Sequence, residues 1–176
     1  MMVKGLSLLV MILMFFGCSR MDVSVDYDEL YDFKSAKSFV VDSSTENSKN
    51  TLLASRVVNA LENELGLKNY NKVTKDEADL IFVFHFATKD KSDVQTSFGL
   101  SGFRGSRYGT GMMMSTTNTY EYTEGTLVID ALNPKTKKTV WRGVGVKELS
   151  SKDSPAKRTE AVNKAVKKIM EKFPIN

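Results

Sequence analysis

The hydrophobic period of this sequence changes along the chain, and the order of the changes limits the folds that it can adopt. From Leu53 to Leu65 a leucine or valine recurs every four residues, which predicts an amphipathic helix. A second apolar set of helical spacing runs from Ala161 to Phe173. The other apolar segments alternate or run together as strands do. We expect these strands at residues 22–26, 38–42, 80–87, 119–132 and 139–149.

This order predicts one α+β domain over residues 22–176. Its expected architecture is a two-layer sandwich, in which a mainly antiparallel sheet of about five strands carries two helices on one face. Asn133-Pro134 marks a hairpin turn, and Pro155 suits the first position of the last helix. Gly66 is expected as a helix C-cap and Gly125 as a β-bulge. The single tryptophan, Trp141, is expected in the core.

The N-terminus carries a different signal. Lys4 precedes the apolar run Leu6 to Phe16, which only Ser7 interrupts. A run of this length cannot cross a hydrocarbon core that needs about 20 helical residues. It suits the core of a signal peptide, which has roughly 7–15 apolar residues. Gly17 and Cys18 follow directly, and a small residue before a cysteine at this place resembles the lipobox of bacterial lipoproteins.

The resemblance implies that residues 1–17 are removed between Gly17 and Cys18, and that Cys18 becomes lipidated and anchors the protein in a membrane. Phe15 and Phe16 depart from the usual lipobox residues. Residues 18–21 would then form a short tether, and Ser19 implies sorting to the outer membrane with the domain facing the periplasm. An ordinary secretory signal and a buried apolar terminus are the alternatives.

Charge and residue usage exclude several kinds of site. The net charge of +4 becomes +3 once Lys4 is removed, which is too small an excess to indicate nucleic-acid binding. Cys18 is the only cysteine, so the mature domain has no disulfide and no cysteine metal site. His85 is the only histidine and alternates with apolar residues, so we expect a structural role for it. The acidic residues from Asp26 to Asp32 lack calcium-loop spacing and predict a solvated turn. No metal, cofactor or catalytic residue is predicted.

Residues 90–118 form a glycine-rich segment, expected as a loop whose ends are strand. Five glycines fall between Gly99 and Gly111, and no phosphate-binding glycine motif is present. The segment is either a flexible connection or a loop that contacts a partner, because aromatic residues, arginine and methionine are enriched at interfaces. The candidate contact residues are Phe98, Phe103, Arg104, Arg107 and Tyr108.

Four marks in this order resemble one family. They are Ala78-Asp79-Leu80, the stretch from Glu124 to Asp130, the stretch from Val140 to Gly143, and Phe173-Pro174. The chain resembles the bacterial lipoproteins called domain of unknown function 4136. The resemblance implies a lipid-anchored envelope domain with a two-layer α+β fold, and it brings no activity and no catalytic residues.

The function expected from these observations is a non-enzymatic binding or assembly-accessory module of the cell envelope. It would dock on an envelope protein through residues 98–114 and a neighbouring sheet edge. One alternative is a carrier of a lipid or another apolar small molecule, in a cleft lined by Phe82, Phe84, Phe86 and methionines. Another is an envelope hydrolase that uses carboxylates in an unrecognised arrangement.

Overall fold

The computed structural model describes residues 21–43, 51–101, 112–150 and 153–174, with residues 95–101 and 112–116 described by their backbone. The expected cleavage and lipidation residues, Gly17 and Cys18, lie outside these ranges. Four of the expected contact residues also lie outside these ranges, namely Phe103, Arg104, Arg107 and Tyr108.

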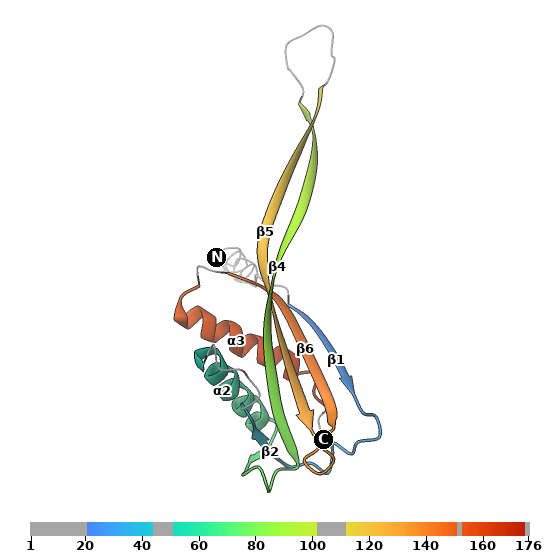
Figure 1. Cartoon of the computed structure of the whole chain (residues 1–176), viewed down its shortest axis with the longest axis vertical. Coiled ribbons are helices and arrows are strands. Elements are labelled where there is room, and N and C mark those ends of the chain that lie inside the picture. Colours follow the sequence, from blue (N-terminus) through green and yellow to red (C-terminus); the bar gives the residue numbers. More distant parts are fainter. Residues whose placement is uncertain (1–20, 44–50, 102–111, 151–152, 175–176) are drawn as a thin grey trace, which may run out of the picture.

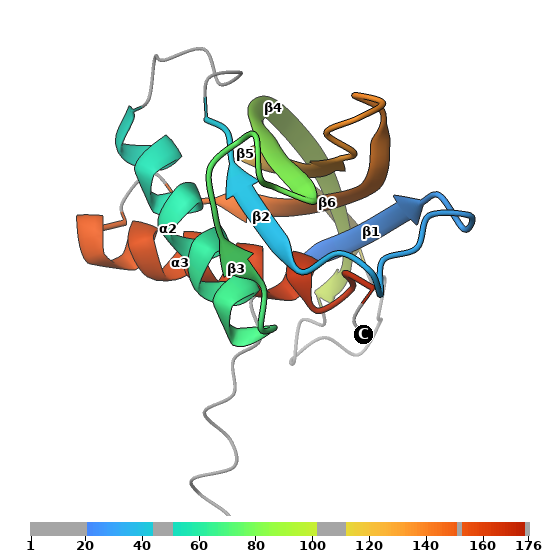
Figure 2. The same cartoon turned by 90° about the horizontal axis from the view of Figure 1, so that it is seen from below.

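The described chain forms a two-layer α+β sandwich (Figures 1 and 2), as the sequence predicted. One six-stranded sheet has the order β1-β6-β5-β4-β2-β3, and two helices cover one of its faces. Neighbouring strands are antiparallel except for β2, which is parallel to both β4 and β3. The sixth strand, which the sequence analysis missed, is the two-residue β3. The elements are β1 (Asp22–Tyr27), β2 (Ser38–Val41), α2 (Thr51–Leu67), β3 (Asn71–Lys72), β4 (Leu80–Ser101), β5 (Met112–Leu132), β6 (Thr139–Leu149) and α3 (Pro155–Met170).

The core lies between the sheet and the two helices. Phe82 and Phe84 lie two residues apart on β4, so both side chains face the helices. They are 0% and 1% exposed. Trp141 is fully buried, as expected, and its ring meets the ring of Phe173 edge-on at 5.0 Å between centroids. Phe173 also meets Phe33 edge-on, so a residue beyond the end of α3 joins the sheet, the helices and the β1–β2 connection.

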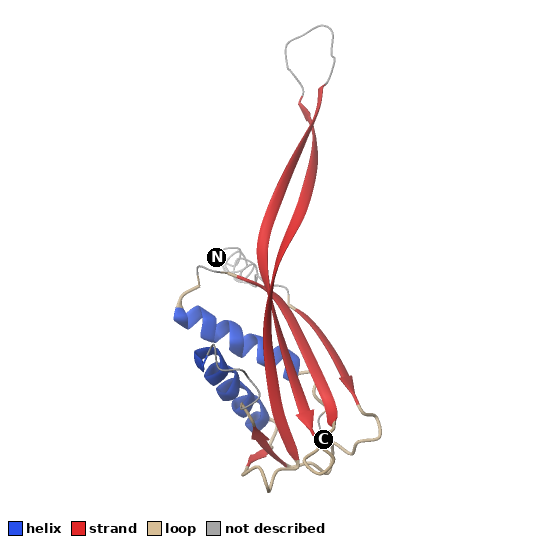
Figure 3. Ribbon diagram, viewed as in Figure 1, coloured by secondary structure: helices blue, strands red, loops and turns tan. Residues whose placement is uncertain are grey.

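The hairpin of β4 and β5 extends far beyond the rest of the sheet (Figures 1 and 3). In the segment 90–118, expected as a loop whose ends are strand, residues 90–101 and 112–118 are strand. These two segments hold three threonines together with Val94 and Phe98, and such residues favour extended backbone. Phe98 belongs to β4 and pairs with Ser115.

Two local expectations were wrong. Helix α2 continues past Gly66 to Leu67, and the left-handed residue that ends it is Asn69, with φ of 64°. The Tyr70 N–H donates to the Leu65 carbonyl and the Asn69 N–H donates to the Gly66 carbonyl, which is the Schellman pattern. Gly125 pairs regularly with both neighbouring strands, and the irregularity of β5 lies between Ala131 and Leu132.

Candidate functional site

The outer part of the β4–β5 hairpin, residues 91–101 and 112–122, is called the projecting ribbon here. Strand β6 pairs with β5 only from Thr123 inward, and β2 pairs with β4 only as far as Phe82. Within the described chain, the two strands of the ribbon therefore pair only with each other. At ~3.3 Å per residue, eleven residues on each strand make the ribbon about 35 Å long.

Among the described residues, no further strand pairs with either long edge of the ribbon. From Val94 to Ser101 and from Met112 to Tyr120 the sequence contains no charged residue and no proline. Charged residues and proline are the usual means by which natural proteins block a free strand edge. Val94 and Tyr120 are 64% and 57% exposed. From Val94 to Ser101 and from Met112 to Tyr120, the ribbon thus lacks the residues that prevent pairing.

Polar contacts hold the base of the ribbon to the sheet. The Tyr120 hydroxyl donates to Glu148 of β6 at 2.7 Å, and this hydrogen bond raises the pKa of Tyr120. Lys91 forms an ion pair with Glu124. Tyr122 stacks on Tyr120 with 5.9 Å between ring centroids. Of these contacts, the hydrogen bond between Tyr120 and Glu148 ties the base of the ribbon to β6.

A groove of about 1430 Å³ opens beside the base of the ribbon, between the sheet and the first turns of α2 and α3. We call it the basal groove. It exceeds the usual size of small-molecule pockets, roughly 300–1,000 Å³. Its apolar lining comes from five elements and from the residue before β1. These side chains are Met21, Leu52, Leu53, Val57, Phe86, Leu127, Leu149, Ala161, Val162 and Ala165.

The groove differs from the cleft expected from the sequence. Phe82 and Phe84, expected to line it, fill the core instead, because their strand face is covered by the helices at that level. Phe86, two residues further along β4, does line the groove. Of the methionines, Met21 lines it.

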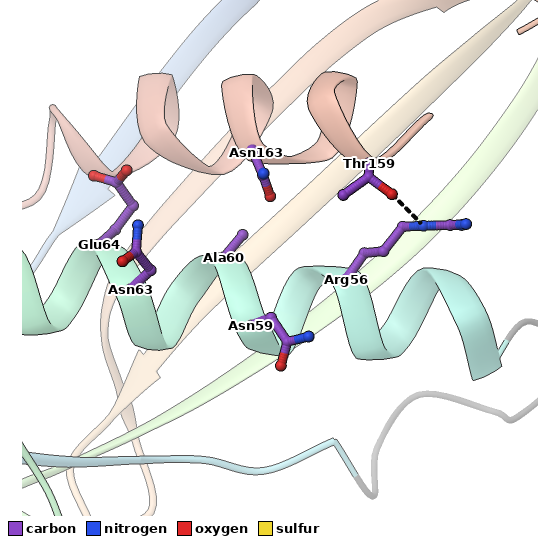
Figure 4. A pocket seen from close by; sticks show the side chains of 7 residues that line it. All are labelled: Arg56, Asn59, Ala60, Asn63, Glu64, Thr159 and Asn163. Carbon is purple, nitrogen blue, oxygen red and sulfur yellow. Dashed lines mark hydrogen bonds between the residues drawn. The ribbon is translucent and has the colours of Figure 1, made fainter. Parts of the chain in front are cut away.

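A smaller pocket of about 320 Å³ lies between the two helices (Figure 4). Six of its seven lining residues have polar or charged side chains, and three of these are asparagines. The Arg56 Nε–H donates to Thr159 Oγ1 at 3.0 Å and ties α2 to α3. Glu64 supplies the one carboxylate of the lining. The pocket has no apolar floor comparable with that of the basal groove.

The titratable residues singled out in the sequence do not gather. His85 is exposed, on the part of β4 that extends beyond its pairing with β2. Asp28 and Asp32 accept the backbone N–H groups of Leu30 and Lys34, which makes the acidic segment a turn, as expected. Among the described residues, no three histidine, cysteine or acidic side chains are placed to hold a metal ion.

The marks that carried the family resemblance are structural. Asp79 Oδ2 accepts the backbone N–H groups of Lys37 and Ser38 at 2.9 and 3.0 Å, which joins the starts of β2 and β4 and lowers the pKa of Asp79. Arg142 donates two hydrogen bonds of 2.6 Å to Asp130 across β5 and β6. With Trp141 and Phe173 in the core, each of the four marks supports the sandwich.

The family described as "Domain of unknown function (DUF4136)" matches residues 23–175. The chain belongs to the DUF4136 family. The sequence has no match among curated proteins. In the part of this DUF4136 chain that the structure describes, neither helix has the length and apolar character needed to cross a membrane.

Several solved structures resemble the DUF4136 chain. A PDZ domain protein from Parabacteroides distasonis shares 16% identity at a TM-score of 0.57, over 89% of this chain and 37% of that one. This chain thus spans little more than a third of that protein. The PelC dodecamer from Paraburkholderia phytofirmans shares 9% identity at 0.51, over 86% and 95%. A putative neuraminyllactose-binding hemagglutinin homolog from Helicobacter pylori shares 15% at 0.44, over 83% and 88%. At such identities the first two likenesses show the fold alone.

Proposed function

We propose that this chain is a non-enzymatic, lipid-anchored protein of the cell envelope that binds a protein partner by strand pairing along its projecting ribbon. The observation that carries this proposal is the ribbon itself, with eleven residues on each strand that pair only with each other among the described residues.

The physical argument begins with stability. A two-stranded hairpin is marginally stable in water unless a third strand or a helix packs against it. Added strands are a common mode of peptide recognition, in which backbone hydrogen bonds supply much of the affinity. The ribbon supplies both free edges without charge or proline between Val94 and Ser101. A partner strand along either edge would satisfy the exposed N–H and C=O groups.

The membrane anchor is supported by the sequence, through the short apolar run and the Gly17-Cys18 pair. The outer membrane and a domain facing the periplasm are proposed on the same ground, through Ser19. The PelC fold neighbour is described as a dodecamer, which supports a second copy of this chain as one form of the partner. An unrelated envelope protein is the other form.

The test is photo-crosslinking in living cells, with the reactive residue at Thr119 of the ribbon. We expect one discrete adduct that is lost in Cys18→Ala, because the unanchored chain would leave the membrane where the partner lies. An adduct of twice the chain mass identifies a second copy. The matched control places the same residue at Leu67, which is 72% exposed at the far end of α2.

A charge on the edge gives a second arm. Val94 pairs with Thr119, and Val94→Lys should abolish the adduct while the melting temperature stays unchanged, because the side chain is 64% exposed. Leu67→Lys should leave the adduct intact. The absence of any adduct along both edges of the ribbon, in cells that contain the anchored protein, would contradict the proposal.

A further inference from the structure

The basal groove leaves large apolar side chains uncovered, and the docking function proposed above does not use it. Leu52 at the start of α2 is 68% exposed, and Leu149 at the end of β6 is 38% exposed. Both line the groove, together with Phe86 and Val162, which are half-buried. Large continuous apolar surface on a folded domain commonly marks a binding site.

The charges around the groove indicate an uncharged ligand. Four basic and four acidic side chains line it, so the rim presents no excess of either sign. They are Arg56, Lys91, Lys147 and Arg158, and Asp90, Glu121, Glu148 and Asp153. Lys91 and Glu148 are already engaged, with Glu124 and Tyr120 respectively. An anion or a cation would thus find little net attraction, whereas an apolar chain would find a wide apolar floor.

The N-terminal segment reaches the same groove. Met21, the first described residue, lines it and packs against the core. Its Cε lies over Gly145, where a Cβ would collide with it, so the absence of a side chain at 145 makes room for Met21. Cys18 is three residues earlier, and three residues span at most about 11 Å. Any group carried by Cys18 therefore begins within about 11 Å of the groove lining.

We propose that the basal groove binds a long-chain acyl group carried by Cys18 of the same chain, an inference that rests on the lipid anchor proposed above. The tether makes binding intramolecular, and a short linker gives an effective concentration of about millimolar. The groove would cover an acyl chain when the protein is away from a bilayer. When Cys18 is anchored in a membrane, the groove would hold the base of the ribbon close to the membrane surface.

To test this, cells that make the full chain are grown in the presence of a diazirine-bearing fatty acid. After irradiation the protein is digested, and adducts are mapped by mass spectrometry. We expect an intramolecular adduct between the Cys18 peptide and peptides that contain Phe86, Leu149 or Val162. Two pairs of variants test the site.

Ala161→Trp fills the groove from α3 and should remove the adduct. Its control is Ala87→Trp, the same change at an exposed position of β4 on the face away from the helices. Leu52→Asn makes the groove mouth polar and should reduce the adduct by about tenfold. Its control is Leu67→Asn on the same helix, where the leucine is 72% exposed and outside the groove. Because Leu52 is itself 68% exposed, Leu52→Asn tests the site even if Ala161→Trp does not fold.

The outcomes separate this inference from the proposed function. A chain that incorporates no label at Cys18 overturns both the anchor and the inference. A labelled chain without groove adducts, or with adducts that all four variants leave equal, overturns the inference alone. Groove adducts that persist in Cys18→Ala would come from membrane lipids, and would overturn the assignment to the chain's own acyl group.

Discussion

Gly143→Ala should destabilise the protein, although the backbone at this position suits alanine. A Cβ at residue 143 would collide with Ile169 Cγ2 and Trp141 Cη2, and would lie 2.9 Å from Trp141 Cζ2. Both side chains are fully buried, and the Trp141 ring is fixed against Phe173. Neither can move aside, so the added methyl overpacks the core. Overpacking costs about 1–3 kcal/mol, and the reduced freedom of the unfolded chain returns about 0.4–1 kcal/mol.

The net loss of about 1–2 kcal/mol should lower the melting temperature by about 2–8 °C in a domain of this size. Calorimetry of the two proteins measures it. Gly125→Ala is the matched control, because the Cβ there would meet Leu149 atoms at 2.8 and 2.9 Å. Leu149 is 38% exposed and can turn toward solvent, so this change should stay within about 0.5 kcal/mol. Equal losses in both variants, or no loss in Gly143→Ala, would refute the packing argument.

Three further changes test the framework by urea unfolding. Arg142→Ala leaves the buried Asp130 carboxylate without its two hydrogen bonds and should cost about 1–3 kcal/mol; an unchanged midpoint would contradict this. Asp79→Asn should lower the free energy of unfolding at pH 7. The pKa of Asp79 is lowered in the folded protein, so its ionised carboxylate stabilises the fold above the unfolded pKa of about 4. The difference should vanish as the pH falls through the lowered folded pKa, and a constant difference would count against the hydrogen bonds from Lys37 and Ser38. Asn69→Val should cost at least about 1 kcal/mol because its φ is positive, whereas Asn69→Gly should be nearly neutral.

The sandwich could be predicted from the sequence because its signals are periodic. The spacing from Leu53 to Leu65 and the Pro155 start gave both helices close to their observed bounds. The end of α2 was misplaced because Gly66 and Asn69 can both adopt the left-handed conformation. In the structure Asn69 adopts this conformation, and the resulting helix end buries Tyr70 against the core beside Leu65.

The projecting ribbon was underestimated for a different reason. Its strands lack the apolar alternation of a half-buried sheet, since nothing in the described chain covers them, and the glycines from Gly99 onward favoured a loop. The basal groove could be predicted only in part, because the expected cleft shares Phe86 and a methionine with it but not the rest of its lining. It is assembled from side chains far apart in the sequence, such as Leu52 and Leu149, and no local pattern connects them.

The marks that identify the family therefore indicate how the sandwich is held together, and they do not indicate which ligand it binds. Asp79 joins β2 to β4, Arg142 and Asp130 join β5 to β6, and Phe173 fills the core. The ribbon beyond Thr123 contains none of them. A chain can thus keep every mark while its ribbon binds a different partner, because changes in the ribbon leave these contacts untouched. For this reason the experiments on Thr119, Val94 and the groove decide the function, whereas variants of the family marks measure stability.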